Sequence, residues 1–178
     1  MLKNKKLVKI AVCMLLSVTL VCASFLEVFA EDVANFVPYT DTENNMYYHA
    51  EITASVDKND GIVYAVQAST LVAKNIEQFS ATYGNLFIVT IIRVSDEGEE
   101  IYCLREETSL DLAVAGAGAE ARTEWIVPNM MNPFDYVTTL HIVYDLDNVE
   151  YDVAGNPYNP VIWSYRGVYG YNDFLLFS

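Results

Sequence analysis

The sequence is poor in cysteine, histidine and basic residues, and these shortages exclude several kinds of protein. Its 178 residues include 3 cysteines, 2 histidines and 10 Lys and Arg against 24 Asp and Glu. No Gly-x-Ser-x-Gly or His-Glu-x-x-His sequence occurs, so the local signatures of serine hydrolases and zinc proteases are missing. The scarcity of basic residues argues against nucleic acid or anionic lipid headgroups as partners, because phosphate groups are bound by Lys and Arg.

The first thirty residues have the layout of a cleavable secretory signal. A basic N-terminus precedes an uncharged, mostly apolar run from Ile10 to Leu26, and Val28-Phe29-Ala30 places suitable residues before a signal-peptidase site. The basic residues are Lys3, Lys5, Lys6 and Lys9. The alternative is an uncleaved membrane anchor, but the apolar run is near the lower length limit for a spanning helix. We therefore predict cleavage after Ala30 and a secreted or cell-surface protein.

Removal of residues 1–30 changes the composition of the remaining chain, 31–178. It takes away four Lys and one Glu, which leaves 148 residues with six basic and 23 acidic side chains and a formal net charge of −17. It also takes away Cys13 and Cys22, so Cys103 has no intramolecular disulfide partner. Cys103 lies in an apolar, strand-like run, and we expect it to be buried and inert. The length fits one domain without a membrane span, and the charge suits solubility, cationic partners or calcium.

Residues 46–71 have the clearest strand pattern in the chain. Apolar and polar residues alternate from Met46 to Asp57, which predicts a strand with one dry face and one wet face. The turn 57–61 ends in Asp-Gly, a common hairpin signal, and residues 62–71 follow as the second strand. A hairpin alone is marginally stable in water, so we expect a second layer to cover its apolar face.

Later segments provide further strands between turn signals. The predicted strands are Leu86–Ser95, Ile101–Glu106, Leu110–Val114, Arg122–Val127, Tyr136–Leu146 and a terminal strand in Val161–Ser178. This pattern predicts an all-β fold, a single antiparallel β-sandwich of roughly seven to nine strands with immunoglobulin-like or jelly-roll topology. A short helix near residues 70–83 fits the helical spacing of Val72, Ile76 and Phe79, whereas the alternative extends the second hairpin strand to Ala73.

Residues for acid–base chemistry are few apart from the carboxylates. His141 and Asp145 share one face of a predicted strand, but four residues of extended chain separate their Cα atoms by about 13 Å, too far for a direct hydrogen bond. We predict that His49 and His141 are half-exposed strand residues. Two converging carboxylates would serve a glycosidase, and with 23 acidic residues in 31–178 such a pair is an unspecific signal.

One loop has the composition of a calcium site. Residues 145–152 place several hard oxygen ligands at the end of a strand, as calcium prefers. The candidate ligands are Asp145, Asp147, Asn148, Glu150 and Asp152. The loop is not an EF-hand, because Val149 and Glu150 occupy its fifth and sixth positions. The alternative is an acidic turn without a metal.

The last predicted strand carries a row of large aromatic residues at odd positions. These are Trp163, Tyr165, Tyr169 and Tyr171, with Gly167 between them. In an extended strand they form one stripe. An exposed stripe would bind sugar rings or an extended peptide, and Gly167 would let the ligand approach closely. A buried stripe would be the inner face of a closing strand, which is the usual place for large aromatics.

These observations favour a secreted or cell-surface binding or structural module without catalysis, which recognises an extracellular glycan or protein. One alternative is an extracellular hydrolase with paired carboxylates, which a deep pocket and carboxyl groups of raised pKa would support. The other is an assembly subunit that pairs through an edge strand at residues 161–171, by β-augmentation.

Overall fold

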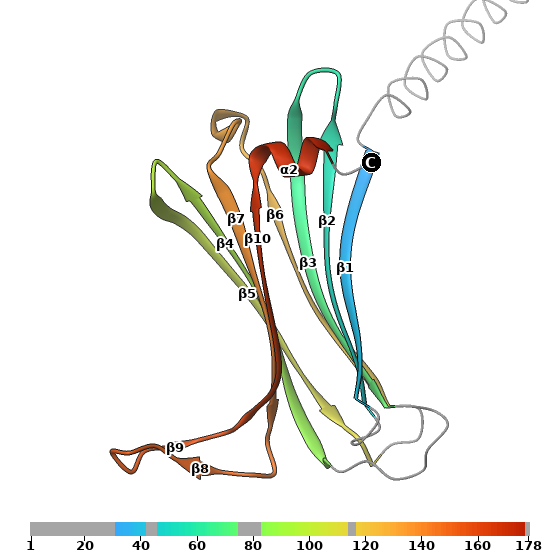
Figure 1. Cartoon of the computed structure of the whole chain (residues 1–178), viewed down its shortest axis with the longest axis vertical. Coiled ribbons are helices and arrows are strands. Elements are labelled where there is room, and N and C mark those ends of the chain that lie inside the picture. The colour runs from blue at the N-terminus through green and yellow to red at the C-terminus, as the bar shows by residue number, and fades with distance from the viewer. Residues whose placement is uncertain (1–30, 42–45, 75–82, 114–116, 177–178) are drawn as a thin grey trace, which may run out of the picture. The chain divides into compact units, whose positions relative to one another are not determined.

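A computed structural model describes residues 31–41, 46–74, 83–113 and 117–176, and within them the chain is mainly antiparallel β, as predicted (Figure 1). The long strands are β1 (Glu31–Asp41), β2 (Met46–Asp57), β3 (Ile62–Lys74), β4 (Asn85–Asp96), β5 (Glu99–Asp111), β6 (Gly118–Ile126), β7 (Tyr136–Asp145) and β10 (Val161–Gly170). The short elements are η1 (Asn129–Met131), β8 (Glu150–Tyr151), β9 (Pro157–Tyr158) and the helix α2 (Tyr171–Leu176).

The predicted hairpin is confirmed as β2 and β3. Buried and half-buried residues alternate without a break along β2, and the buried set runs from Met46 to Val56. Asp57 Oδ1 accepts hydrogen bonds from the backbone N–H groups of Asn59 and Asp60, which closes the turn. Gly61 follows with φ of 65°, a left-handed conformation that glycine adopts without steric cost.

The strands form two four-stranded sheets. Sheet A has the order β1-β2-β3-β6, and sheet B has the order β10-β7-β4-β5. β3 pairs with β6 in sheet A, and β4 pairs with β7 in sheet B. An immunoglobulin domain likewise pairs its second strand with its fifth and its third strand with its sixth. With β1 counted as an additional edge strand, the strand order is compatible with the predicted immunoglobulin-like topology.

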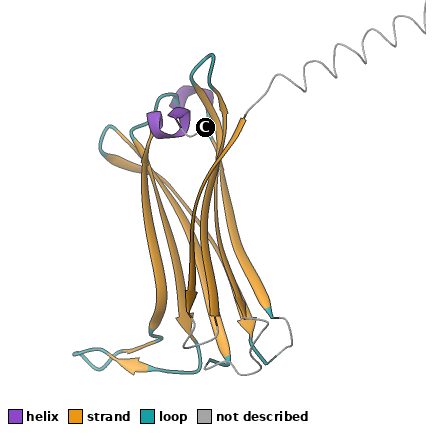
Figure 2. Ribbon diagram, turned by 45° about the vertical axis from the view of Figure 1, so that its right-hand side comes forward, coloured by secondary structure: helices purple, strands orange, loops and turns teal. Residues whose placement is uncertain are grey.

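The inner faces of the two sheets pack against each other as a β-sandwich (Figure 2). One apolar cluster joins Ile52 and Val66 of sheet A to Ile92 and Val137 of sheet B. A second cluster, which includes Tyr48 and Leu86, fills the other end of the interface. Burial of apolar surface contributes roughly 25 cal/mol per Å², so the hairpin gains its stability from this second layer.

Three segments differ from the predicted secondary structure. Leu110 and Asp111 are the end of β5 and residues 112–113 form a turn, so the separate strand predicted at Leu110–Val114 is wrong. Thr70–Lys74 belongs to β3 and not to a helix, which agrees with the alternative that extended the second hairpin strand to Ala73. Residues 75–82 of the predicted helix lie outside the described residues. The C-terminal segment begins a helix, α2, where a strand was predicted. Asp173 Oδ2 accepts the Gly170 N–H at 2.7 Å, which is one of the two hydrogen bonds of a capping box, and the helix starts at Tyr171. Phe174 then anchors α2 in the core with 1% of its surface exposed.

Cys103 is exposed, so the prediction of a buried thiol is wrong. It lies in β5, an edge strand of sheet B in which residues 99–107 are exposed apart from the half-buried Leu104. Cys103 alternates with Leu104, which packs against the core, so the thiol lies on the outer face of sheet B. Among the described residues, no helix has the length and apolar composition needed to cross a bilayer.

Candidate functional site

The predicted aromatic stripe faces the interior of the sandwich. Trp163 is half-buried and stacks on Tyr48 of β2, with ring centroids 5.3 Å apart and ring planes inclined by 8°. Tyr165 is half-buried and lies against the His141 ring at 5.8 Å. Tyr169 is buried with 6% of its surface exposed. The stripe therefore packs against sheet A instead of forming a row open to solvent.

The remaining members of the stripe are also used inside the protein. Tyr171 is the first residue of α2, and its hydroxyl donates to the carbonyl oxygen of Gly61 at 2.5 Å. The Tyr169 ring covers Gly167 so closely that a Cβ at this glycine would collide with it. The lack of a side chain at Gly167 therefore makes room for the Tyr169 ring, and not for a ligand as predicted. A binding role for the four aromatics stays a prediction that their placement does not favour.

The predicted calcium ligands do not converge on one point. Asp145 is buried and accepts hydrogen bonds from the Asp147 backbone N–H at 2.9 Å and from the Asn148 side chain. The Asp147 carboxylate instead accepts the backbone N–H groups of Gly84 and Asn85 at 2.8 and 2.7 Å. These bonds hold the end of β7 to the start of β4, which is a structural use of the loop.

The other two candidate ligands have separate partners. Glu150 accepts the Tyr158 hydroxyl at 2.6 Å, and Asp152 accepts the backbone and side-chain N–H groups of Asn156. The side-chain hydrogen bond from Asn156 lowers the pKa of Asp152, and a corresponding bond from Asn85 lowers the pKa of Asp147. In the described part of the chain, no three His, Cys, Asp or Glu residues lie close enough together to hold a metal ion.

His141 is buried, so the prediction that it is half-exposed is wrong. Its Nδ1 lies 3.0 Å from the Thr70 Oγ1, which lies 2.6 Å from the Thr90 Oγ1. The Thr90 hydroxyl donates to the carbonyl oxygen of Ala121 at 2.7 Å, so its oxygen accepts from Thr70, and Thr70 accepts from the imidazole N–H. Burial disfavours the charged imidazole and lowers the pKa of His141 from 6.5 to about 4.

This chain of hydrogen bonds crosses the core between the two apolar clusters. Along β4, Thr90 lies between Ile88 of one cluster and Ile92 of the other. Along β3, Thr70 lies between Ala68 and Val72 in the same way. This polar band of Thr70, Thr90 and His141 links both sheets. No ligand can reach it, because all three side chains are buried. A shift of one residue in strand register would separate the three side chains, so the band specifies the register.

A groove on the outer face of sheet A, which we call the β2–β3–β6 groove, is open to a ligand. It has a volume of about 400 Å³. Its lining residues are Glu51, Thr53 and Ser55 of β2, Ala65, Gln67 and Ser69 of β3, and Glu120, Arg122 and Glu124 of β6. The strand register sets Glu51, Ser69 and Arg122 side by side across the sheet. Because Ser69 is short, a hollow forms between the longer side chains of Glu51 and Arg122.

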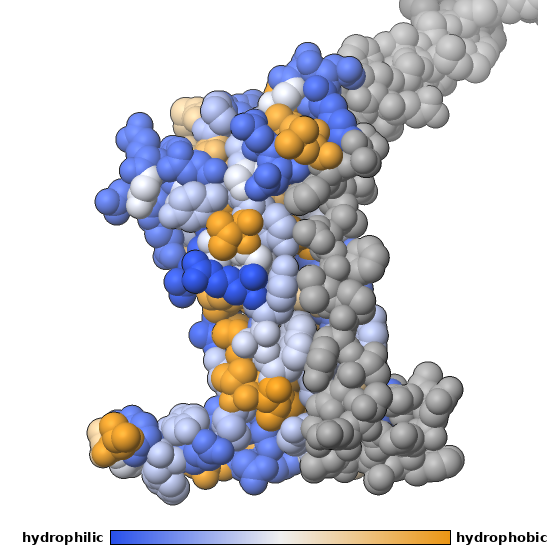
Figure 3. All heavy atoms as spheres, viewed as in Figure 1, coloured by the Kyte–Doolittle hydropathy of each residue, from blue (hydrophilic) through white to orange (hydrophobic). Residues whose placement is uncertain are grey.

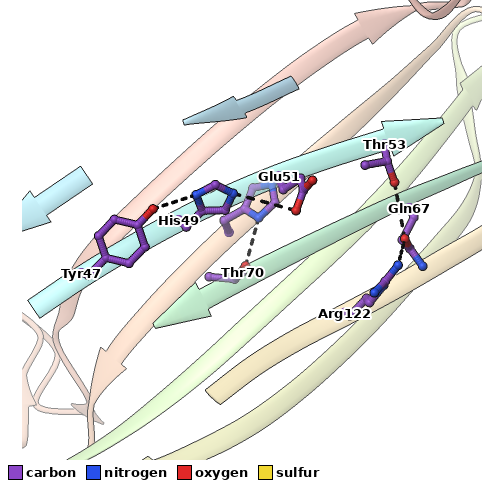
Figure 4. Close-up of polar contacts among 8 residues, drawn as sticks. Tyr47, His49, Glu51, Thr53, Gln67, Thr70 and Arg122 are labelled. Atoms are coloured by element: carbon purple, nitrogen blue, oxygen red, sulfur yellow. Dashed lines mark hydrogen bonds and ion pairs between the residues drawn. The ribbon is translucent and has the colours of Figure 1, made fainter. Parts of the chain in front are cut away.

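Two cross-strand contacts order the floor of the β2–β3–β6 groove (Figure 4). The Arg122 guanidinium donates to the Gln67 side-chain oxygen, and the Thr53 hydroxyl donates to the same oxygen at 3.4 Å. Glu120 and Glu124 flank Arg122 on its own strand. The groove therefore presents three carboxylates and one guanidinium, together with hydroxyl and amide groups.

An aromatic pair extends the groove along β2. Tyr47 and His49 are half-buried on the outer face, with ring centroids 6.1 Å apart and the Tyr47 hydroxyl 3.1 Å from His49 Nδ1. His49 Nε2 lies 3.9 Å from the Glu51 carboxylate (Figure 4). The row of Tyr47, His49 and Glu51 follows from the period of two along a strand, since alternate residues share a face.

Sequence reasoning found one side of this groove and missed the other. The wet face of β2, with His49 and Glu51, was visible in the alternation of residues 46–57. Glu120, Arg122 and Glu124 alternate with buried Ala121 and Trp125 in the same manner, a signal that would have predicted a wet face on β6. The pairing of β3 with β6 was not readable, because 43 residues separate the end of β3 at Lys74 from the start of β6 at Gly118.

The chain matches no protein-family model and no curated protein.

Proposed function

We propose that the protein is a secreted, non-catalytic binding module that recognises a neutral or amino-bearing glycan in the β2–β3–β6 groove. The observation that carries the proposal is the row of Glu51, Ser69 and Arg122, which opens a polar hollow on an ordered sheet face. Export rests on the signal-like residues 1–30, which precede the first strand.

The lining of the groove suits the hydroxyl groups of a sugar. A sugar hydroxyl donates one hydrogen bond and accepts others, so it pairs well with a carboxylate on one side and a guanidinium on the other. Glu51 and Arg122 supply this combination across a width of two strand spacings, roughly 10 Å between Cα atoms. The half-buried Tyr47 ring beside the groove adds an apolar surface for a ring face.

The charge of the groove selects against acidic ligands. Three carboxylates against one guanidinium give it a formal charge of −2, within a chain of net charge −17 for residues 31–178. An anionic ligand would be repelled, whereas a neutral sugar or an amino sugar would not.

Glycan-array screening followed by calorimetry on the purified protein tests this proposal. Arg122→Ala should weaken binding of a glycan hit by about tenfold or more, because a charge-assisted hydrogen bond is lost. The matched control is Arg105→Ala, which also removes an exposed arginine with a carboxylate neighbour on an edge strand. Equal affinities of the two variants, with unchanged melting temperatures, would reject the groove as the binding site.

A second candidate function is assembly through β10. This strand lies at the edge of sheet B, and no described strand pairs with its outer side. The edge strands β5 and β6 carry several charged residues, which discourage pairing with another chain, whereas Arg166 is the one charged residue of β10. Concentration-dependent dimerisation that Val168→Pro abolishes would support β-augmentation, since proline removes a backbone donor.

A further inference from the structure

We infer that the outer face of sheet B holds a second site, for the carboxylate of an acidic sugar residue such as a uronate. The site is a groove of about 320 Å³ at the end of sheet B near the β4–β5 turn, within the range of small-ligand pockets. Its lining residues are Arg93, Ser95, Gly98, Glu100, Tyr136, Thr138, Leu140 and Arg166. We call it the arginine groove. It lies on the opposite sheet from the β2–β3–β6 groove and goes beyond the proposed function.

The charge of the arginine groove is exceptional in this protein. Residues 31–178 contain six basic side chains against 23 acidic ones, and two of the six line this one groove. Glu100 is its one carboxylate, which leaves a formal charge of +1. The surrounding chain repels anions in general, so an anion that binds here does so through local contacts and not through the overall field.

The two guanidiniums are placed to share one anion. In the strand register Arg166 lies opposite Leu140, and Arg93 lies opposite Thr138, so the arginines flank β7 from its two neighbouring strands. Their Cα atoms are roughly 12 Å apart, from two strand spacings and a two-residue offset. Arg166 is exposed and has no ion-pair partner among the described residues. Its fork of N–H groups is therefore free to bind a carboxylate in the bidentate manner.

The ion pair between Glu100 and Arg93 is weak in the free protein. Its carboxylate lies 3.6 Å from the Arg93 Nε, and both side chains are about half exposed, at 47% and 49%. Exposed pairs of this kind contribute little, because water screens them. An incoming carboxylate can therefore use the remaining N–H groups of Arg93, in competition with Glu100.

The floor of the arginine groove contains hydroxyl groups without partners. Thr138 and Ser95 are 6% and 7% exposed, yet neither hydroxyl makes a hydrogen bond to any described residue. A hydroxyl without a protein partner at the floor of a groove can donate a hydrogen bond to a ligand oxygen. These two hydroxyls are the second observation, besides the charge, that points to a ligand with oxygen acceptors.

The rim distinguishes a sugar from a free inorganic anion. Tyr136 is 38% exposed beside the hydroxyl floor, and Leu140 adds an apolar contact. A sugar ring packs its C–H face on such an aromatic ring, whereas sulfate or phosphate gains nothing from it. Figure 3 shows the side of the molecule over β10 and β7 as interspersed hydrophilic and apolar residues, as a mixed sugar-binding surface requires.

Calorimetric titration of the purified protein with a trigalacturonate, at pH 7 and moderate salt, tests the inference. The neutral trigalactoside and inorganic sulfate are the comparison probes. The protein should bind the uronate, and Arg166→Ala should weaken it by about tenfold or more, as loss of a bidentate charged contact predicts. Arg166→Lys should recover part of the loss, because the charge remains but the planar fork does not.

Three further variants separate this site from general charge effects. Thr138→Val should weaken the uronate several-fold without lowering the melting temperature, because the removed hydroxyl has no partner in the free protein. Glu100→Gln should strengthen it, because the competing carboxylate is neutralised. Arg105→Ala, an arginine outside the groove, should leave it unchanged.

Several results would overturn the inference. These are the absence of uronate binding at millimolar concentration, equal losses in Arg105→Ala and Arg166→Ala, or weaker binding in Glu100→Gln. Sulfate binding as tight as that of the uronate would refute recognition of a sugar. Arg122→Ala should not affect uronate binding, so failure of the β2–β3–β6 groove and failure of the arginine groove are distinguishable.

Discussion

Replacement of His141 by Gln should remove most of the acid sensitivity of folding between pH 7.5 and pH 5. His141 is 1% exposed and bonded to Thr70, and its burial lowers the pKa to about 4 from 6.5. As the pH falls below 6.5, the unfolded chain takes up a proton at this imidazole and the folded protein does not. Unfolding is therefore favoured progressively until the pH reaches the folded pKa, below which the penalty stays constant.

The size of this effect follows from the two pKa values. At pH 7.5 the imidazole is neutral in both states, and its contribution to the pH dependence is near zero. At pH 5 it is mostly protonated in the unfolded chain and mostly neutral in the folded protein, so the free energy of unfolding falls by about 2 kcal/mol. Asp147 and Asp152, whose lowered pKa values start from 3.8, act below this window, so the interval above pH 5 reports on the histidine.

Urea unfolding at closely spaced pH values, followed by intrinsic tryptophan fluorescence, measures the effect. Gln can keep a hydrogen bond to Thr70 but has no titratable group, so the variant should be less stable throughout while its pH dependence is flat. His49→Gln is the matched control, because His49 is the other imidazole of residues 31–178 and lies on the outer face of sheet A. If His141→Gln retains the wild-type decrease between pH 7.5 and 5, the buried imidazole is not its cause.

Three further predictions concern packing, reactivity and processing. Trp163→Ala should lower the stability by about 2–3 kcal/mol and the melting temperature by roughly 6–12 °C, because half-buried surface and the stacking on Tyr48 are lost; a change within about 2 °C would contradict this. Cys103 should react with a thiol reagent in the native protein within minutes, because it is exposed, and protection until unfolding would show otherwise. The exported protein should begin at Glu31, and intact-mass measurement that finds residues 1–30 retained would reject the cleavage.

Secondary structure was readable wherever it depends on neighbouring residues. The alternation along residues 46–57 and the Asp-Gly turn predicted the β2–β3 hairpin, because side-chain direction and turn conformation are set within a few residues. The strands at β4, β5 and β7 and the all-β class followed from the same local signals. The helix α2 was missed, because its start depends on one hydrogen bond from Gly170 to Asp173 in a segment rich in strand formers.

The candidate sites depend on contacts between strands that are far apart in the sequence, and local sequence patterns do not reveal these contacts. The four aromatics near the C-terminus have the same spacing whether exposed or buried, and the choice was made by sheet A, whose Tyr48 stacks on Trp163. His141 and Asp145 share a mixed face of β7, and the opposite sheet decides that this face points inward.

By itself, then, the sequence determined the strands, the first hairpin, the acidic charge and the signal-like N-terminus, because each is a local or summed property. Tertiary structure alone decided which faces are wet and which residues meet across strands. Arg122 reaches the hollow beside Ser69 because β6 pairs with β3, and Arg166 reaches the groove of Arg93 because β10 and β4 flank β7. Such pairings depend on how loops close and how two apolar faces exclude water together, and neither is encoded within a short window of sequence.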